Sequence, residues 1–167
     1  MFVSKKWILF FSLIFAVAFA EAKFKFDKEK LTYSANAGLQ FGTYTYINIM
    51  PTIGYNFTKE LNIGVGPIFT YINNRYYNQE NTSYGARIYA RYFVYENLFL
   101  IGDYQTINNY WVSSVTRTWL NIPLFGAGYR RNIGEHLYLD FSVLWNFNNA
   151  STLYYPNPIL RGGISYR

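Results

Sequence analysis

The sequence contains no cysteine, and only 14% of its 167 residues are charged. The lack of cysteine excludes a disulfide framework and a lipid anchor on an N-terminal cysteine. A soluble domain usually carries about 25% charged residues, so this chain has too little charge to cover a water-facing surface. No zinc-ligand spacing, phosphate-binding glycine loop or G-x-S-x-G motif occurs. We therefore expect no cofactor, no metal and no enzyme activity.

Long apolar runs are also scarce, because the only one lies at the N-terminus. It follows two lysines and extends from Trp7 to Phe19. A transmembrane helix needs about 20 apolar residues, so this run is too short to be a membrane anchor. The layout predicts a secretory signal peptide over residues 1–20, cleaved after Ala20, with cleavage after Ala22 as the alternative.

Charge is scattered through the rest of the chain. The signal peptide contains Lys5 and Lys6 and no acidic residue, so its removal lowers the formal net charge from +6 to +4. Four lysines in residues 21–30 are mixed with acidic residues, whereas a nucleic-acid-binding protein gathers its cations on one face. We expect no nucleic-acid partner, a periplasmic lead-in over residues 21–30, and a single domain over residues 31–167.

The residues after the lead-in alternate between apolar and polar with a period of two, which is typical of strands. Aromatic residues, at 22% of the chain, also favour strands. Leu137, Leu139 and Phe141, for example, alternate with polar neighbours such as Asp140. Eight strands are expected, over residues 31–41, 46–57, 61–71, 84–94, 98–107, 117–130, 137–148 and 158–167. The sixth is the least clear, because both of its faces are mixed.

The connections alternate in length. Short turns are expected at residues 58–60, 96–97 and 132–135, and long loops at residues 73–82, 108–116 and 149–157. Short periplasmic turns and longer outer loops are typical of bacterial barrels. The sequence therefore predicts an all-β protein, a closed antiparallel up-and-down transmembrane β-barrel of about eight strands in the cell outer membrane.

Alternation alone allows either face to point outward. An apolar interior would make the protein a soluble lipocalin-like carrier, but the polar face is mostly Gly, Ser, Thr and Asn, which suit the narrow lumen of an eight-stranded barrel. The apolar face also places aromatic residues at strand ends, as two interfacial girdles require. These are Phe41, Tyr71, Tyr84, Tyr104 and Trp145 near the long loops, and Tyr55, Phe57, Tyr92 and Tyr166 near the short turns.

Three prolines lie inside predicted strands, at Pro51, Pro67 and Pro123. Because proline lacks the N–H that a closed ladder needs, we expect a bulge at each of them.

The chain after the signal resembles the small outer-membrane barrels of the OmpA-transmembrane and OmpX type. Its richness in Asn, Tyr and Phe and the segment Pro51-Thr-Ile-Gly-Tyr55 are similar to those of Bacteroidota members. The resemblance implies that periplasmic chaperones and the barrel-assembly machinery are partners. Such barrels usually end on an aromatic residue, whereas here Arg167 follows Tyr166.

Charged residues are expected on the lumen face of four strands. These are Arg87, Arg91, Asp103, Asp140 and Arg161. Buried charges persist only when paired, so we interpret the set as a plug of Arg-carboxylate pairs. The alternative is a narrow, porin-like ion path lined by the same charges.

The long loops carry the candidate surface contacts. These are Arg75, Tyr76, Tyr77, Tyr110, Trp111, Arg117, Tyr154 and Tyr155. Aromatic side chains suit contacts with sugars or proteins, and the arginines suit the phosphates of lipopolysaccharide. The only histidine, His136, lies at a short turn, away from outer-leaflet chemistry. A structural or adhesive envelope barrel, embedded in outer-membrane lipid, is the function expected first.

Overall fold

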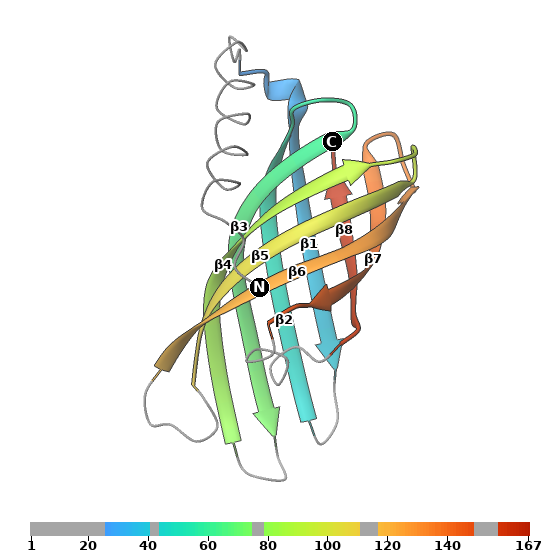
Figure 1. Ribbon diagram of the computed structural model, residues 1–167. Coiled ribbons are helices and arrows are strands. Elements are labelled where there is room, and N and C mark those ends of the chain that lie inside the picture. The colour runs from blue at the N-terminus through green and yellow to red at the C-terminus, as the bar shows by residue number, and fades with distance from the viewer. Residues whose placement is uncertain (1–25, 41–43, 75–78, 111–116, 149–156) are drawn as a thin grey trace, which may run out of the picture.

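The computed structural model describes residues 26–40, 44–74, 79–110, 117–148 and 157–167. Eight strands form one closed antiparallel barrel, in which each strand pairs with its neighbours in sequence and β8 pairs with β1 (Figure 1). The predicted fold class is therefore confirmed. The strands are β1 (Leu31–Gln40), β2 (Tyr44–Asn56), β3 (Leu61–Asn74), β4 (Gln79–Phe93), β5 (Leu98–Tyr110), β6 (Arg117–Asn132), β7 (Leu137–Asn146) and β8 (Ile159–Tyr166). Within the described ranges, no helix is both long and apolar enough to span a membrane.

Several strands extend further toward the long loops than the sequence predicted. β3 and β4 stay paired as far as Asn74 and Gln79, although a loop was expected from residue 73 to 82. β5 likewise continues to Tyr110 instead of ending at residue 107. The predicted ends were placed where apolar alternation stops. Backbone pairing needs no apolar face, so the ladder continues beyond the point where the apolar alternation stops.

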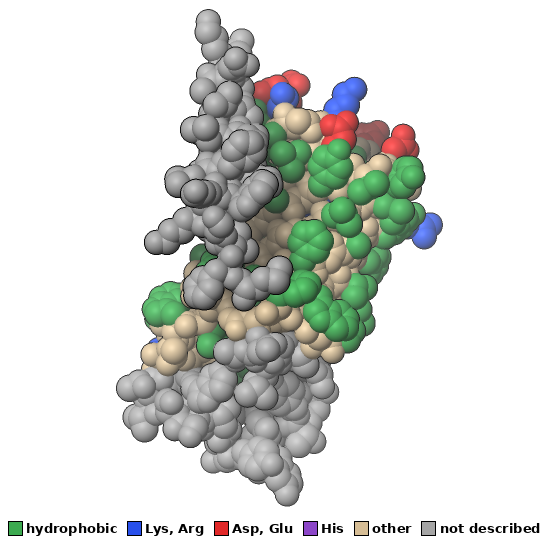
Figure 2. Space-filling view, viewed as in Figure 1, with side chains coloured by type: hydrophobic (Ala, Val, Ile, Leu, Met, Phe, Trp, Pro, Cys, Tyr) green, Lys and Arg blue, Asp and Glu red, His purple; other side chains and the backbone are tan. Residues whose placement is uncertain are grey.

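The side chains face as predicted, with apolar residues outward and most polar residues inward. Val65, Phe69 and Trp119 are each 55% exposed, whereas Asn48 and Thr70 are 2% and 1% exposed. The burial pattern also settles the sixth strand, because Ile122 and Leu124 of β6 are buried. Figure 2 shows hydrophobic side chains over the middle of one face, with most charged atoms at the short-turn end.

The outward face forms an uncharged belt. Of its described positions in the eight strands, only Glu80, Arg117 and Arg131 carry charge, and all three lie near strand ends. Trp119 and Tyr129 of β6 are ten residues apart. At ~3.3 Å per residue and a tilt of ~40°, that separation is about 25 Å along the barrel axis. It matches the ~25 Å apolar band of outer-membrane barrels.

The predicted bulges at the three prolines are wrong. The β2–β3 register is the same for the pairs Ile49–Phe69 and Ile53–Val65. A constant register places Pro51 opposite Pro67, so the two residues that lack an N–H share one gap in the ladder. Pro123 lies one residue before the β6–β7 pairing begins, and its carbonyl accepts a hydrogen bond from the Phe147 N–H (3.2 Å). No inserted residue is needed at these positions.

The described part of the lead-in docks on the barrel. Asp27 caps the short 3-10 helix η1 (Lys28–Lys30), and its own N–H donates to Tyr55 Oη at 3.2 Å. Phe26 stacks on the Tyr55 ring with centroids 5.7 Å apart. The start of β1 is therefore held at the short-turn end, where the chain also terminates (Figure 1).

The strand pairing of β1 with β8 closes the barrel. It consists of five residue pairs, from Tyr33–Tyr166 to Ala37–Gly162, whereas β5 and β6 share thirteen. The seam is thus the shortest of the eight ladders.

Candidate functional site: a charged lumen

Two clusters of charged side chains lie inside the barrel. The central cluster comprises Arg87, Asp103 and Arg161, and the short-turn cluster comprises Arg91, Arg130, Asp140 and Ser165. Strand alternation places Arg87 and Arg91 on the same inward face of β4, four residues apart. The two aspartates come from β5 and β7, so the clusters link strands across the lumen.

In the central cluster, Asp103 accepts from three side chains through one oxygen. Arg87 Nη2 donates to Asp103 Oδ2 at 2.6 Å, and Arg161 Nη1 donates to it at 2.5 Å. Gln105 Nε2 lies 3.2 Å from the same oxygen. The side chains of Arg87, Asp103 and Arg161 are at most 5% exposed. This cluster is therefore almost fully buried.

In the short-turn cluster, Arg130 holds Asp140 with two parallel hydrogen bonds. Its Nε donates to Oδ1 at 2.7 Å and its Nη2 donates to Oδ2 at 2.9 Å. Arg91 Nη1 and Ser165 Oγ also donate to Asp140 Oδ2, at 2.9 and 3.0 Å. Such bidentate geometry is the strongest form of an Arg-carboxylate pair. Arg130 is 12% exposed and lines a pocket of about 450 Å³ at the short-turn end.

Aromatic rings separate the guanidinium groups. The Tyr89 ring lies 5.1 Å from the Arg87 guanidinium carbon and 5.4 Å from that of Arg91. Arg91 also lies 4.5 Å from the Phe99 ring centroid. Cations over ring faces are stabilised by the ring quadrupole, which offsets part of the repulsion between neighbouring arginines.

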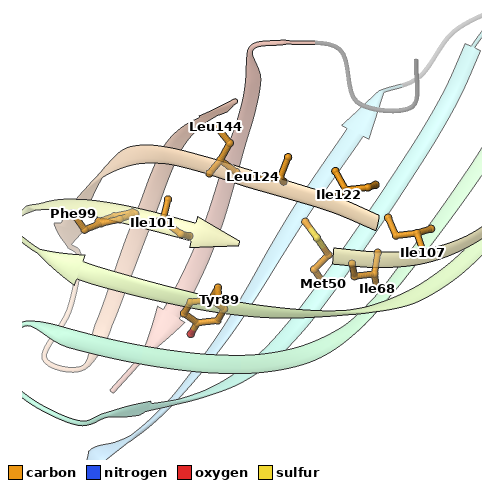
Figure 3. Packing of buried hydrophobic residues seen from close by; sticks show 9 residues of the cluster. All are labelled: Met50, Ile68, Tyr89, Phe99, Ile101, Ile107, Ile122, Leu124 and Leu144. Atoms are coloured by element: carbon orange, nitrogen blue, oxygen red, sulfur yellow. The ribbon is translucent and has the colours of Figure 1, made fainter. Parts of the chain in front are cut away.

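An apolar layer fills the lumen between the central cluster and the long loops. Its members are Met50, Ile68, Ile107, Ile122, Leu124 and Leu144, each at most 3% exposed. Figure 3 shows Met50, Ile68, Ile107 and Ile122 gathered at one end of the cluster. The expectation of a lumen built from small polar residues was therefore incomplete. Since side chains only just fill an eight-stranded barrel, bulky apolar residues suit any inward position that is not needed for charge pairing.

The structure brings together all five residues predicted for the lumen. The sequence missed Arg130, because the faces of the sixth strand are mixed, and it missed Tyr89 and Phe99. Positions 122, 124 and 130 share one face of β6. Once Ile122 and Leu124 are assigned inward, strand alternation also assigns Arg130 inward. Among the described residues, no group of three or more His, Asp or Glu side chains is arranged to hold a metal.

Most predicted surface contacts lie outside the described residues. These are Arg75, Tyr76, Tyr77, Trp111, Tyr154 and Tyr155. Tyr110 is the last residue of β5. Arg117 bonds within the barrel rim: its Nη2 donates to the Thr82 carbonyl at 3.0 Å, its Nη1 donates to Asn108 Oδ1 at 3.3 Å, and its guanidinium lies over the Tyr84 ring. Its contact with lipopolysaccharide stays a prediction.

The barrel is similar to solved membrane-barrel structures. The Yersinia pestis outer membrane protein Ail in a phospholipid bilayer nanodisc aligns with a TM-score of 0.52 at 13% identity, over 82% of this chain and 97% of that one. The chain has the fold of a small outer-membrane barrel. The N-terminal β-barrel domain of Pseudomonas aeruginosa OprF aligns with a TM-score of 0.48 at 12% identity, over 81% of this chain and 93% of that one. The de novo designed TMB2.3 aligns with a TM-score of 0.46 at 20% identity, over 83% and 93% of the chains. No protein-family model and no curated protein matches the sequence.

Proposed function

We propose that this protein is an exported outer-membrane barrel with a plugged lumen and a structural, adhesive or surface-interaction role in the Gram-negative envelope. The observation that carries the proposal is the reversal of polarity across the barrel wall. The outer face is uncharged over about 25 Å, whereas four arginines and two aspartates lie inside. An uncharged, aromatic-edged band of that height suits lipid and not water. The same polarity argues against a soluble carrier, whose apolar side chains would face inward.

The lumen supports a plug better than a channel. Two layers block it, because the ion-paired clusters lie on the short-turn side and the apolar layer lies on the long-loop side. An apolar layer with members at most 3% exposed excludes water, and an ion cannot cross it without losing its hydration. The paired charges thus act as packing that fills a narrow barrel.

The membrane location and the plug are tested together. We expect the full chain, expressed in a Gram-negative cell, to fractionate with the outer membrane and to migrate differently on gels before and after boiling. Planar bilayers containing the purified barrel should show no steady single-channel conductance, because the lumen is filled. Conductance is measured for the unaltered protein and for Arg91→Ala, with the outward-facing Arg131→Ala as the matched control.

Two outcomes count against this function. A mature chain that is monomeric and stable in buffer without detergent would exclude the lipid-facing belt. Steady conductance that is lost in Arg91→Ala, but kept in Arg131→Ala, would replace the plug with a narrow channel lined by the lumen charges.

The surface role rests on the long loops, whose aromatic and arginine residues suit sugars, proteins and lipopolysaccharide phosphates. We expect a barrel with Gly/Ser sequences in place of residues 75–78, 111–116 and 149–156 to fold normally. Its binding to surfaces coated with lipopolysaccharide or with a partner protein should fall at least tenfold, because six of the eight candidate contact side chains are gone. Unchanged adhesion and an unchanged envelope would leave only the structural role.

A further inference from the structure

The central cluster has one more positive charge than negative charge. Arg87 and Arg161 share the single carboxylate of Asp103, and no other charged side chain in the described residues contacts them at ion-pair distance. The side chains of Arg87 and Asp103 are 1% and 0% exposed, and that of Arg161 is 5% exposed. A formal charge of +1 is therefore enclosed where water cannot screen it.

Arginine cannot remove this surplus by losing a proton. A buried lysine or histidine can become neutral, but the guanidinium stays charged in proteins. A buried charge without a counter-charge is among the most costly features a fold can contain. The Tyr89 ring next to Arg87 lowers this cost but supplies no negative charge.

Hydrogen-bonding capacity is left over at the same place. Within the described residues, Arg87 Nε and Nη1 are buried donors without an acceptor. Asp103 Oδ1 and Gln105 Oε1 are buried acceptors without a donor. Water could satisfy both kinds of atom, but water does not neutralise the charge. An anion next to Arg87 would accept a hydrogen bond from one of its free donors and would also neutralise the surplus positive charge.

The short-turn cluster differs in this respect. It also contains two arginines and one aspartate, but Arg130 is 12% exposed and lines the pocket at the short-turn end. Solvent reaches that cluster and can screen its surplus charge. Arg91 Nε of the short-turn cluster is also a buried donor without an acceptor, but only in the central cluster is every charged side chain at most 5% exposed.

We propose that the central cluster binds one small monovalent anion the size of chloride at one of the two free donors of Arg87, Nε or Nη1, which point to different edges of the guanidinium. The size limit follows from the close packing of the lumen, because side chains only just fill the interior of an eight-stranded barrel. The anion and Asp103 together carry two negative charges, which balance the positive charges of Arg87 and Arg161. This site goes beyond the proposed function, because it would exist whether the lumen is plugged or conducts.

The test compares thermal unfolding of the detergent-solubilised barrel in sodium chloride and in sodium gluconate at equal ionic strength. We expect chloride to raise the melting temperature by about 5 °C in a saturable manner, since a ligand that binds only the folded state stabilises it. Crystals grown in bromide should show an anomalous peak within hydrogen-bond distance of Arg87. Arg131→Gln, which removes an exposed arginine, should keep the full chloride effect.

Two variants should abolish the effect by opposite routes. Arg87→Met removes the surplus cation, and Gln105→Glu places a carboxylate next to Asp103, to which Gln105 Nε2 already donates at 3.2 Å. Each variant should have the same melting temperature in sodium chloride as in sodium gluconate. Crystals of Gln105→Glu should show no bromide peak. If Arg87→Met does not fold, Gln105→Glu and the bromide peak of the unaltered protein decide the question. The proposal fails if the unaltered protein lacks either the chloride effect or the peak, or if Gln105→Glu keeps both.

Discussion

Asp103→Asn should destabilise the folded barrel by about 3–5 kcal/mol, because it leaves two buried arginines without their carboxylate. Asp103 Oδ2 accepts from both Arg87 and Arg161, so one substitution breaks two charge-assisted bonds inside a closed wall. Asparagine retains the shape and one acceptor but not the charge. The measurement is guanidinium unfolding of the barrel in detergent micelles, followed by tryptophan fluorescence.

Two further variants separate charge from shape. Glu135→Gln makes the same chemical change at an exposed turn, and we expect an effect within about 0.5 kcal/mol. Replacing the whole cluster, with Arg87→Met, Asp103→Leu and Arg161→Met together, should recover most of the loss, since apolar residues of similar volume often substitute well for a buried ion network. Equal stability of Asp103→Asn and the unaltered protein would show that the pairs contribute nothing.

Gly126→Ala should have a comparable effect for a different reason. A Cβ at Gly126 would lie 2.0 Å from the Val143 carbonyl oxygen and 2.8 Å from Leu144 Cα, both backbone atoms of β7. Backbone in a paired ladder cannot rotate away as a side chain would. We expect a loss of about 3 kcal/mol or more, at the upper end of overpacking effects, and a smaller heat-modifiable fraction on gels.

Gly162→Ala is the matched control for this change. A Cβ at Gly162 would meet no atom within 4 Å, and the residue lies in β8 of the same sheet. Its stability should stay equal or rise slightly, because alanine restricts the unfolded chain more than glycine does. Similar losses in both variants would mean that alanine disfavours these strands generally and that the close approach of β6 and β7 is not the cause.

The sequence was sufficient to predict the barrel because every second residue of a strand lies on the apolar outward face. Leu137, Phe141 and Trp145 could be assigned outward without knowing their neighbours. Strand ends beyond the apolar belt are fixed by backbone pairing alone, so no apolar pattern in the sequence marks them. The extra residues of β3 and β4 near the long loop therefore could not be predicted.

The lumen was harder to predict because the type of each inward residue is set by its contacts with other inward residues and not by contact with a solvent. Arg87 and Asp103 could be assigned to the lumen by parity, but their pairing depends on the register of β4 and β5, which places Arg87 opposite Gln105 and diagonal to Asp103. Arg130 was missed because Asn121 and Arg131 break the apolar face of the sixth strand. The alternation also assigns Ile68 and Leu144 to the inward face, but the expected lining of small polar residues did not include bulky apolar side chains there.

The five-pair seam has a consequence for how the chain is made. Tyr33 of β1 pairs with Tyr166 of β8, although the two residues lie far apart in the sequence. The outer edge of β1 therefore stays unpaired until β8 has been synthesised and has folded. Until then the incomplete sheet has two unpaired edge strands, and unpaired edge strands can pair with other chains and cause aggregation. A substitution that slows the pairing of β8 with β1 should therefore increase aggregation during folding, even if it leaves the stability of the folded barrel unchanged.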